Sequence, residues 1–278
     1  MIALEQKIWK WKAASGDMPA STEEVQDWIA RETTLTVVVN GSELVSFSSS
    51  PDHCQDLALG FLFTEGVITS RGDIARLHHD VSADRVEVDL AEGIDFKPAE
   101  WNRTRTLTSG CGQGVQLNVP PNPRRMIKDE EPLIVDATYF RRLFSNLRAF
   151  SVWYERTGCI HQSTLVPIPG APIIREDIGR HNAVDKAIGA GLAAGVNFGH
   201  SLLSTTGRLS SDMTSKAARA GIPMIVSRSA PTSLAVAIAE DAGMTLIGFV
   251  RGPRINIYTH PHRINLNPTD ANVSSDDA

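Results

Sequence analysis

The spacing of the apolar positions predicts a β-rich first part of the chain. Four short stretches there predict strands: residues 35–39, 44–47, 86–90 and 103–108. Asn40-Gly41 separates the first two runs, and because both residue types tolerate positive φ, we predict a tight hairpin turn. Ser50-Pro51 has the pattern of an N-cap and a first helical position, so it predicts a helix that ends near Gly66. Residues 1 to about 30 keep no steady period and predict no element.

From residue 136 onward, the pattern predicts helices and strands that alternate. Two helices are predicted, over residues 136–150 and from about 179 to 194, and two more are predicted to end near residues 221 and 243. Strands are predicted around residues 173–174, 202–203, 224–226 and 245–250. Such alternation is typical of βαβ crossovers, so we expect a mainly parallel sheet covered by helices. The predicted fold class is therefore α/β.

A stiff, proline-rich stretch divides the chain. Residues 120–125 read PPNPRR, which is turn-prone and predicts a crossing between domains. We expect an N-terminal β-rich portion over residues 1–125 and an α/β core over residues 126–264. Residues 265–278 are rich in Ser, Asp and Asn and predict a disordered acidic tail.

Composition limits the classes of partner. The 278 residues carry a formal net charge of -5, so no general attraction to nucleic acid is expected and any anion site must be local. No stretch reaches the ~18 consecutive apolar residues of a membrane span, and the start has no signal core, so we expect a cytoplasmic protein without a membrane segment. Three cysteines without regular spacing favour reduced thiols over a disulfide framework.

Cys111 is the candidate nucleophile. It lies in a loop of small residues, TSGCGQG at 108–114, where glycines free backbone N–H groups to face an anion and nothing bulky shields the sulfur. A tight turn that contains Cys by chance fits the same residues. Cys54, in a predicted first helical turn, and Cys159, near His161, fit incidental or buried packing cysteines better than reactive ones.

Two strand-to-helix junctions and one strand end are candidate phosphate sites. Residues 204–211 and 227–233 are rich in Ser, Thr and Gly, and each contains an arginine. Such junctions lie at the carboxyl ends of strands, where helix N–H groups and guanidinium groups can bind phosphate oxygens. The candidate residues are Phe249, Val250, Arg251, Gly252, Pro253, Arg254, Arg208, Arg228, Ser210, Ser229, Thr232 and His181. Ordinary helix capping and a solvated surface turn are the alternatives.

His181 opens a polar segment that begins a predicted helix. His181 and Asp185 are spaced i, i+4, so they can touch on one helix face. A solvent-exposed pair with no further role fits the same spacing. The chain has neither a zinc-deaminase motif nor a phosphate loop of the Gly-x-x-x-x-Gly-Lys-Ser/Thr type, and no metal site is predicted.

Several unusual strings, taken together, resemble one family. They are VNGSEL at 39–44, LALGFLFTEGVI at 57–68, TSGCG at 108–112, TGCIH at 157–161, EDIGRHNAVDK at 176–186 and GRLSSDMTSKAARAGIPMIVSRSAPTSLAV at 207–236. In this order they resemble the formate dehydrogenase accessory sulfurtransferase (FdhD) family, and the resemblance runs from about residue 30 to 260.

The resemblance implies a sulfur carrier. Such a protein takes persulfide sulfur from a cysteine desulfurase and passes it to bis-molybdopterin guanine dinucleotide, which then enters the catalytic subunit of formate dehydrogenase. It implies that Cys111 holds the persulfide, that the FVRGPR stretch at 249–254 binds the cofactor, and that guanine nucleotides mimic it. A three-layer core like the cytidine deaminase fold without zinc, and a homodimer, are further implications.

Two positions depart from the family pattern and open alternatives. Gly114 stands where the family has the second Cys of Cys-x-x-Cys, and Cys159 stands where it tends to have glycine. One hypothesis is that Cys159 lies near Cys111 and replaces the missing thiol; independent drift is the alternative. The alternatives to a sulfur carrier are a module that binds and delivers the cofactor without sulfur chemistry and a generic nucleotide-binding α/β enzyme.

Overall fold

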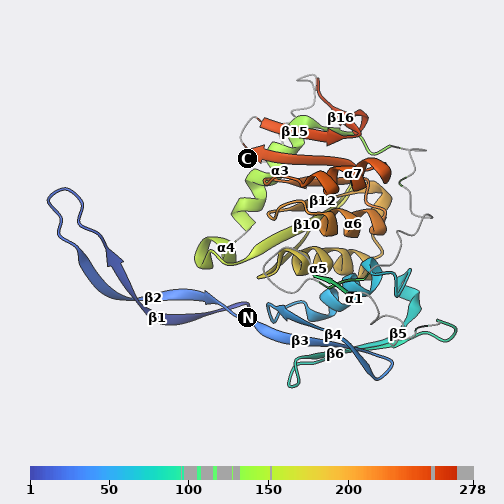
Figure 1. Cartoon of the computed structure of the whole chain (residues 1–278), viewed down its shortest axis with the longest axis horizontal. Coiled ribbons are helices and arrows are strands. Elements are labelled where there is room, and N and C mark those ends of the chain that lie inside the picture. Colours follow the sequence, from blue (N-terminus) through green and yellow to red (C-terminus); the bar gives the residue numbers. More distant parts are fainter. Residues whose placement is uncertain are drawn as a thin grey trace.

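A six-stranded mixed sheet organises the second half of the chain in the computed structural model (Figure 1). The structure describes residues 1–94, 96, 105–107, 115–117, 127, 132–150, 152–251 and 254–267. The strands lie in the order β11 (Ile173–Asp177), β10 (His161–Pro167), β12 (Ser201–Thr205), β13 (Met224–Ser227), β14 (Thr245–Arg251) and β15 (Arg254–Thr259).

The sheet is less parallel than the alternating pattern predicts. Only β12, β13 and β14 run parallel to one another, whereas β11, β10 and β15 pair antiparallel with their neighbours. Parallel strands need a crossover of a dozen or more residues. The connections from β10 to β11 and from β14 to β15 are too short for that, so both must be hairpins.

Helices cover both faces of this sheet. The helices α5 (Arg180–Ala193), α6 (Ser211–Ala220) and α7 (Ser233–Asp241) share one core with strand residues such as Leu203 and Leu246. On the other face, α3 (Ala137–Phe150) packs Phe140 and Phe144 against Leu202 and Val226. Alternate residues of β12 thus enter opposite cores, as the two-residue period of a strand requires. The predicted α/β class is confirmed.

The first part of the chain forms a smaller sheet, of order β4-β3-β6-β5. Its strands are β3 (Thr33–Val39), β4 (Ser42–Ser49), β5 (Ile74–Asp80) and β6 (Arg85–Leu90). The predicted hairpin is confirmed, because Asn40 and Gly41 have φ of 48° and 78° between β3 and β4. The predicted N-cap is wrong: α1 (Cys54–Thr64) begins after His53, since the Ser50 hydroxyl instead accepts a hydrogen bond from the backbone N–H of Ile178.

The helices α1 and α5 lie between the two sheets and pack closely against each other at two glycines. A Cβ on Gly60 would lie 1.8 Å from the carbonyl oxygen of Asp185, and one on Gly189 would lie 1.9 Å from that of Asp56. The two backbones therefore approach so closely that only glycine fits at these positions.

The remaining elements are short or lie apart from the two sheets. They are β1 (Ala3–Lys12), β2 (Ser21–Ala30), β7 (Arg105–Leu107), β8 (Val115–Leu117), β9 (Val135–Asp136), β16 (Ile264–Asn265), α4 (Val152–Thr157) and the 3₁₀ turns Arg71–Asp73, Phe198–His200 and Pro261–Arg263. The pair β1–β2 forms a ribbon that extends away from the body (Figure 1). In the part of the chain that the structure describes, every helix is too short or too polar to cross a membrane.

Candidate functional site

Four arginines line a cavity of about 530 Å³ between α3 and the carboxyl ends of β13 and β14. Its lining residues are Thr138, Arg141, Arg142, Phe144 and Ser145 from α3, Arg228 after β13, and Val250 and Arg251 from β14. Guanidinium groups stay charged and bind phosphate or carboxylate oxygens in pairs. The cavity therefore suits an anionic ligand with several oxygens.

The fold brings these arginines together from three separate segments. The apolar side of α3 buries Phe140 in the core, which leaves the adjacent Arg141 and Arg142 at the cavity. Arg228 and Arg251 are joined directly, because Arg251 Nε donates to the Arg228 carbonyl oxygen at 3.0 Å. Four like charges around one space repel one another, so an anion bound there relieves the repulsion.

The strand end that contains Arg251 has an unusual backbone. Phe249 adopts φ of 52°, and its N–H donates to the Ser229 carbonyl oxygen at 3.1 Å. The guanidinium carbons of Arg251 and Arg254 lie 5.9 and 5.4 Å from the centre of its ring. The aromatic face thus holds both arginines by cation–π contact. The predicted Gly252 and Pro253 lie outside the described residues.

The two strand-to-helix junctions predicted as phosphate sites lie side by side and are hydrogen-bonded to each other. Leu209 N–H donates to the Ala230 carbonyl oxygen, and Thr232 N–H donates to the Leu209 carbonyl oxygen. Thr232 caps α7 by accepting from the Ala235 N–H, so ordinary capping accounts for it. Ser210 is the N-cap of α6, yet its buried hydroxyl makes no hydrogen bond with the residues that the structure describes.

The structure therefore gathers part of the predicted set. Arg228, Val250 and Arg251 lie together at the cavity, and Phe249 adjoins it. The other predicted residues that the structure describes are not part of the cavity's lining: Arg208, Ser210, Ser229, Thr232, Arg254 and His181. Sequence reasoning missed Arg141 and Arg142, whose only signal is two adjacent bases on an amphipathic helix.

His181 lies on the α5 side of the sheet and does not pair with Asp185. Its Nε2 atom is 3.9 Å from the Asp212 carboxylate at the start of α6 and makes no hydrogen bond within the described part of the chain. Burial, with Arg180 and Lys216 nearby, lowers the pKa of His181 to about 3. Burial and Arg180 likewise lower the pKa of His161. Both imidazoles are neutral at physiological pH.

Acid is therefore expected to destabilise the fold through these two histidines. Their folded-state pKa values lie below the ordinary value of 6.5, so the unfolded chain binds more protons as the pH falls. This contribution to stability is fully present above pH 6.5 and is lost as the pH drops toward 3. The urea concentration at the midpoint of unfolding, measured between pH 6.5 and pH 3, should fall less steeply with falling pH in His181→Gln than in the parent. The exposed control His78→Gln should behave like the parent. An equal pH dependence in all three proteins would contradict a buried, neutral His181.

Asp185 belongs to a buried charge cluster instead. Lys216 Nζ lies 2.8 Å from the Asp185 carboxylate and 3.4 Å from that of Glu65, while the Thr64 hydroxyl donates to Asp185 at 3.0 Å. The cluster joins the end of α1 to α5 and α6. The alternative of a solvent-exposed pair is also wrong, because α1 and α6 cover this face of α5.

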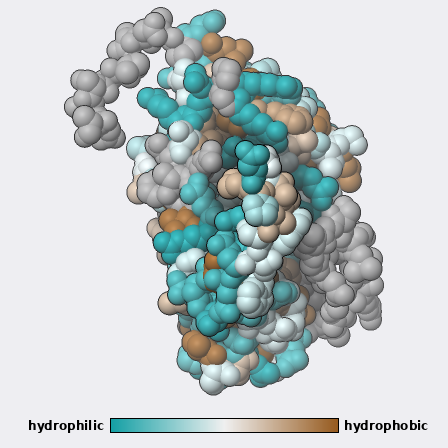
Figure 2. All heavy atoms as spheres, turned by 90° about the vertical axis from the view of Figure 1, so that its left-hand side faces the viewer, coloured by the Kyte–Doolittle hydropathy of each residue, from teal (hydrophilic) through white to brown (hydrophobic). Residues whose placement is uncertain are grey.

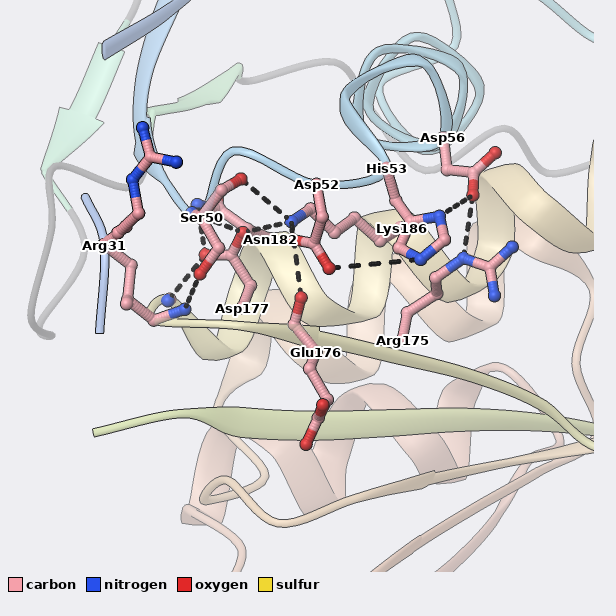
Figure 3. A network of polar contacts seen from close by, with 12 residues as sticks. Arg31, Ser50, Asp52, His53, Asp56, Arg175, Glu176, Asp177, Asn182 and Lys186 are labelled. Carbon is pink, nitrogen blue, oxygen red and sulfur yellow. Dashed lines mark hydrogen bonds and ion pairs between the residues drawn. The ribbon is translucent and has the colours of Figure 1, made fainter. Parts of the chain in front are cut away.

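A second network explains the polar density of residues 175–186 (Figure 3). Lys186 Nζ lies 2.7 Å from the Asp177 carboxylate, with both side chains fully buried, and 3.1 Å from that of Asp52. Asn182 donates to the Ser48 carbonyl oxygen, and Arg175 pairs with Asp56 at 2.8 Å. This network ties the loop before α1 to the core and has a structural role.

The structure describes two of the three cysteines. Cys111 and Gly114 lie outside the described residues, so the nearness of Cys159 to Cys111 stays a prediction. Cys54 is buried, and burial raises the pKa of its thiol to about 11, which makes it unreactive. Cys159 is exposed, contrary to the expected packing role, because Gly158 ends α4 and the chain turns inward only at Ile160.

Across the described ranges, the His, Cys, Asp and Glu side chains form no group of three that could hold a metal ion.

Comparisons with known proteins agree on one family. A family model for FdhD/NarQ matches residues 30–265. The sulfur carrier protein FdhD of Bacillus pumilus is 36% identical over 90% of this chain and 93% of its own length. That of Wolinella succinogenes is 35% identical over 90% and 87%.

A solved structure extends the agreement to the fold. A formate dehydrogenase accessory protein from Desulfotalea psychrophila, 26% identical, superposes with a TM-score of 0.73 over 95% of this chain and 100% of its own. The chain described here, with its arginine-lined cavity at the end of the mixed sheet, therefore belongs to the FdhD/NarQ family.

Proposed function

We propose that this chain carries sulfur on Cys111 from a cysteine desulfurase to bis-molybdopterin guanine dinucleotide, for use by the catalytic subunit of formate dehydrogenase. Support comes from the family, whose relatives are named sulfur carriers, and from the cavity lined by Arg141, Arg142, Arg228 and Arg251. The pyrophosphate groups of a dinucleotide are multivalent anions that such a cavity suits.

The chemistry of loading requires one reactive thiol. The Cys111 thiolate attacks the outer sulfur of the donor persulfide, a new S–S bond forms on Cys111, and the donor cysteine leaves as a thiolate. No second cysteine takes part in this exchange, so Gly114 does not prevent it. The exposed Cys159 remains a candidate for assisting release.

A module that binds and delivers the cofactor without sulfur chemistry is the second candidate. Gly114, in place of the second family cysteine, favours it. The arginine cavity serves both functions equally, so only the fate of sulfur on Cys111 separates them. We also expect a homodimer in the cytoplasm, a core of the cytidine deaminase type, and domains divided near residue 125.

Guanosine diphosphate is expected to bind at least tenfold more tightly than guanosine, because the cavity contributes mainly charge-assisted contacts to phosphate. Each such contact contributes about 1.5–3 kcal/mol. Calorimetry should therefore show a loss of tenfold or more in Arg228→Ala and Arg251→Ala. Arg76→Ala, on the exposed face of β5, is the matched control. Equal affinity for guanosine and its diphosphate would remove the basis for a phosphate site.

A further inference from the structure

We propose that the acidic segment over residues 268–278 binds in the arginine cavity of its own chain, where it competes with the anionic ligand. The segment lies outside the described residues, so its site is inferred from the charge of the cavity, from the place where the segment leaves the fold, and from its own charge. The effect on ligand binding rests on the proposed function above, whereas the binding of the segment requires this chain alone.

The arginine cavity carries positive charge that the described residues do not neutralise. Its four arginines are exposed, and in the part of the chain that the structure describes, none of them forms an ion pair with a carboxylate. By contrast, Arg175 pairs with Asp56 and Arg219 pairs with Glu65. The first turn of α3, at the cavity wall, contains no acidic residue, although the amino end of a helix attracts negative charge. The cavity therefore attracts an acidic group that can reach it.

The segment leaves the fold beside this cavity. The strand β16 pairs in parallel with β9, with Asn265 opposite Asp136. Asn265 Nδ2 donates to the Asp136 carboxylate at 2.7 Å, and Asn265 Oδ1 accepts from the Asn267 N–H at 3.2 Å. The helix α3 begins directly after β9, at Ala137, and its second residue, Thr138, lines the cavity. Because the two strands run in the same direction, the chain after β16 leaves at the end where α3 begins.

The aspartates of the segment can reach the cavity. Adjacent strands lie about 4.8 Å apart and two residues of chain span at most about 7 Å, so Thr138 lies within about 12 Å of Asn265. An extended chain advances about 3.3 Å per residue, which allows Asp270 to lie about 17 Å from Asn265 and Asp276 about 36 Å from it. Even as a flexible coil, the chain from Asn265 to Asp276 spans about 18 Å on average. The connection is thus long enough without being stretched.

The charge of the segment is complementary to the cavity. Its sequence, PTDANVSSDDA, contains Asp270, Asp276 and Asp277 and no Lys, Arg or His. Carboxylates bind guanidinium groups through paired, charge-assisted hydrogen bonds. Pyrophosphate concentrates several negative charges in one small group, whereas the aspartates are spread along a chain. A phosphate ligand therefore displaces the segment, but only after overcoming its contribution.

The surface around the carboxyl ends of the parallel strands suits a polar segment. The strand β14 runs toward the left in Figure 1, so its carboxyl end lies on the side of the molecule that Figure 2 shows. The described residues on that side are mostly hydrophilic, with small separate hydrophobic patches (Figure 2). Charge, rather than apolar burial, must therefore hold the segment. Because salt screens exposed charges, the contact should weaken as the ionic strength rises.

Nitrogen-15 relaxation of the full chain tests this contact without any ligand. At low salt, we expect the backbone amides of the three aspartates to relax like those of the folded body, and to relax like those of a free segment in Arg141→Ala/Arg142→Ala. The matched control is Arg76→Ala/Arg85→Ala, on the exposed side of the four-stranded sheet, which should behave like the parent. Free-segment relaxation in the parent would overturn the proposal.

Removing the charge of the segment, at constant length, tests the electrostatic basis. Asp270→Asn/Asp276→Asn/Asp277→Asn should release the segment, because the amide groups keep the size of the side chains and lose their charge. Ser274→Ala/Ser275→Ala, in the same segment, should leave it bound. A segment that stays bound to the body without its carboxylates would contradict binding in the arginine cavity.

Calorimetry with inorganic pyrophosphate tests the competition. The triple asparagine variant should bind pyrophosphate about five- to tenfold more tightly than the parent at low salt, a modest factor because exposed ion pairs contribute little each. The difference should disappear at ~1 M salt, where the Debye length is about 3 Å. Equal affinity at low salt would overturn the competition alone. If neither protein binds pyrophosphate, the competition fails together with the phosphate site of the proposed function.

Discussion

Replacing Cys111 by serine is expected to abolish persulfide loading. A serine hydroxyl is far less nucleophilic than a thiolate and cannot retain a sulfur atom. After incubation with a cysteine desulfurase and cysteine, sulfur released by cyanide should therefore fall to background in Cys111→Ser. Serine differs from cysteine only by an oxygen in place of the larger sulfur, so the substitution removes the thiol without adding bulk.

The two other cysteines provide the controls. Cys54→Ser should load normally, because burial and a pKa raised to about 11 keep that thiol unreactive. Cys159→Ala should also load, and any effect of this variant should appear in the rate of sulfur release. Normal loading of Cys111→Ser, with loss of loading in Cys159→Ala, would move the carrier role to Cys159.

Replacing Gly189 by alanine is expected to destabilise the fold by about 3 kcal/mol, at the upper end of the cost of overpacking. The new methyl group would meet the Asp56 carbonyl oxygen at 1.9 Å and the Gly60 nitrogen at 2.7 Å. Both are backbone atoms of the α1 segment, so the whole helix must move. Urea unfolding should show the loss as a lower midpoint with an unchanged slope.

Gly191→Ala is the matched control on the same helix. There the methyl group would meet Leu165 Cδ2 at 2.3 Å and the ring of Phe198, which are side-chain atoms that can shift. Alanine also favours the helix by up to about 1 kcal/mol relative to glycine. Gly191→Ala should therefore cost clearly less than Gly189→Ala, and a reversed order would contradict the close packing of α1 and α5.

Sequence reasoning succeeded where local signals mark an element. The hairpin was predicted because Asn40 and Gly41 tolerate positive φ, and the helix predicted from about residue 179 to 194 corresponds to α5. The β1–β2 ribbon was missed because both of its faces are exposed, so apolar and polar residues do not segregate along it. The N-cap at Ser50 was wrong because a tertiary partner, Ile178 N–H, took the hydroxyl.

The candidate site could be predicted only in part, because it is assembled from distant segments. Arg228 and Arg251 were found at strand ends, where such sites are expected. Arg141 and Arg142 belong to the polar side of α3, and nothing local distinguishes them from ordinary solvated bases. The partner of Asp185 is Lys216, 31 residues away, which helix periodicity alone does not reveal.

The intact mass of the parent chain, measured after incubation with a cysteine desulfurase and cysteine, tests the central claim most directly. A sulfur carrier gains the mass of one sulfur atom on Cys111, and it loses that mass when the molybdenum dinucleotide cofactor is added. A chain whose mass stays unchanged through both steps, while it still binds guanosine diphosphate in the arginine cavity, is a delivery module and contradicts the sulfur-carrier account.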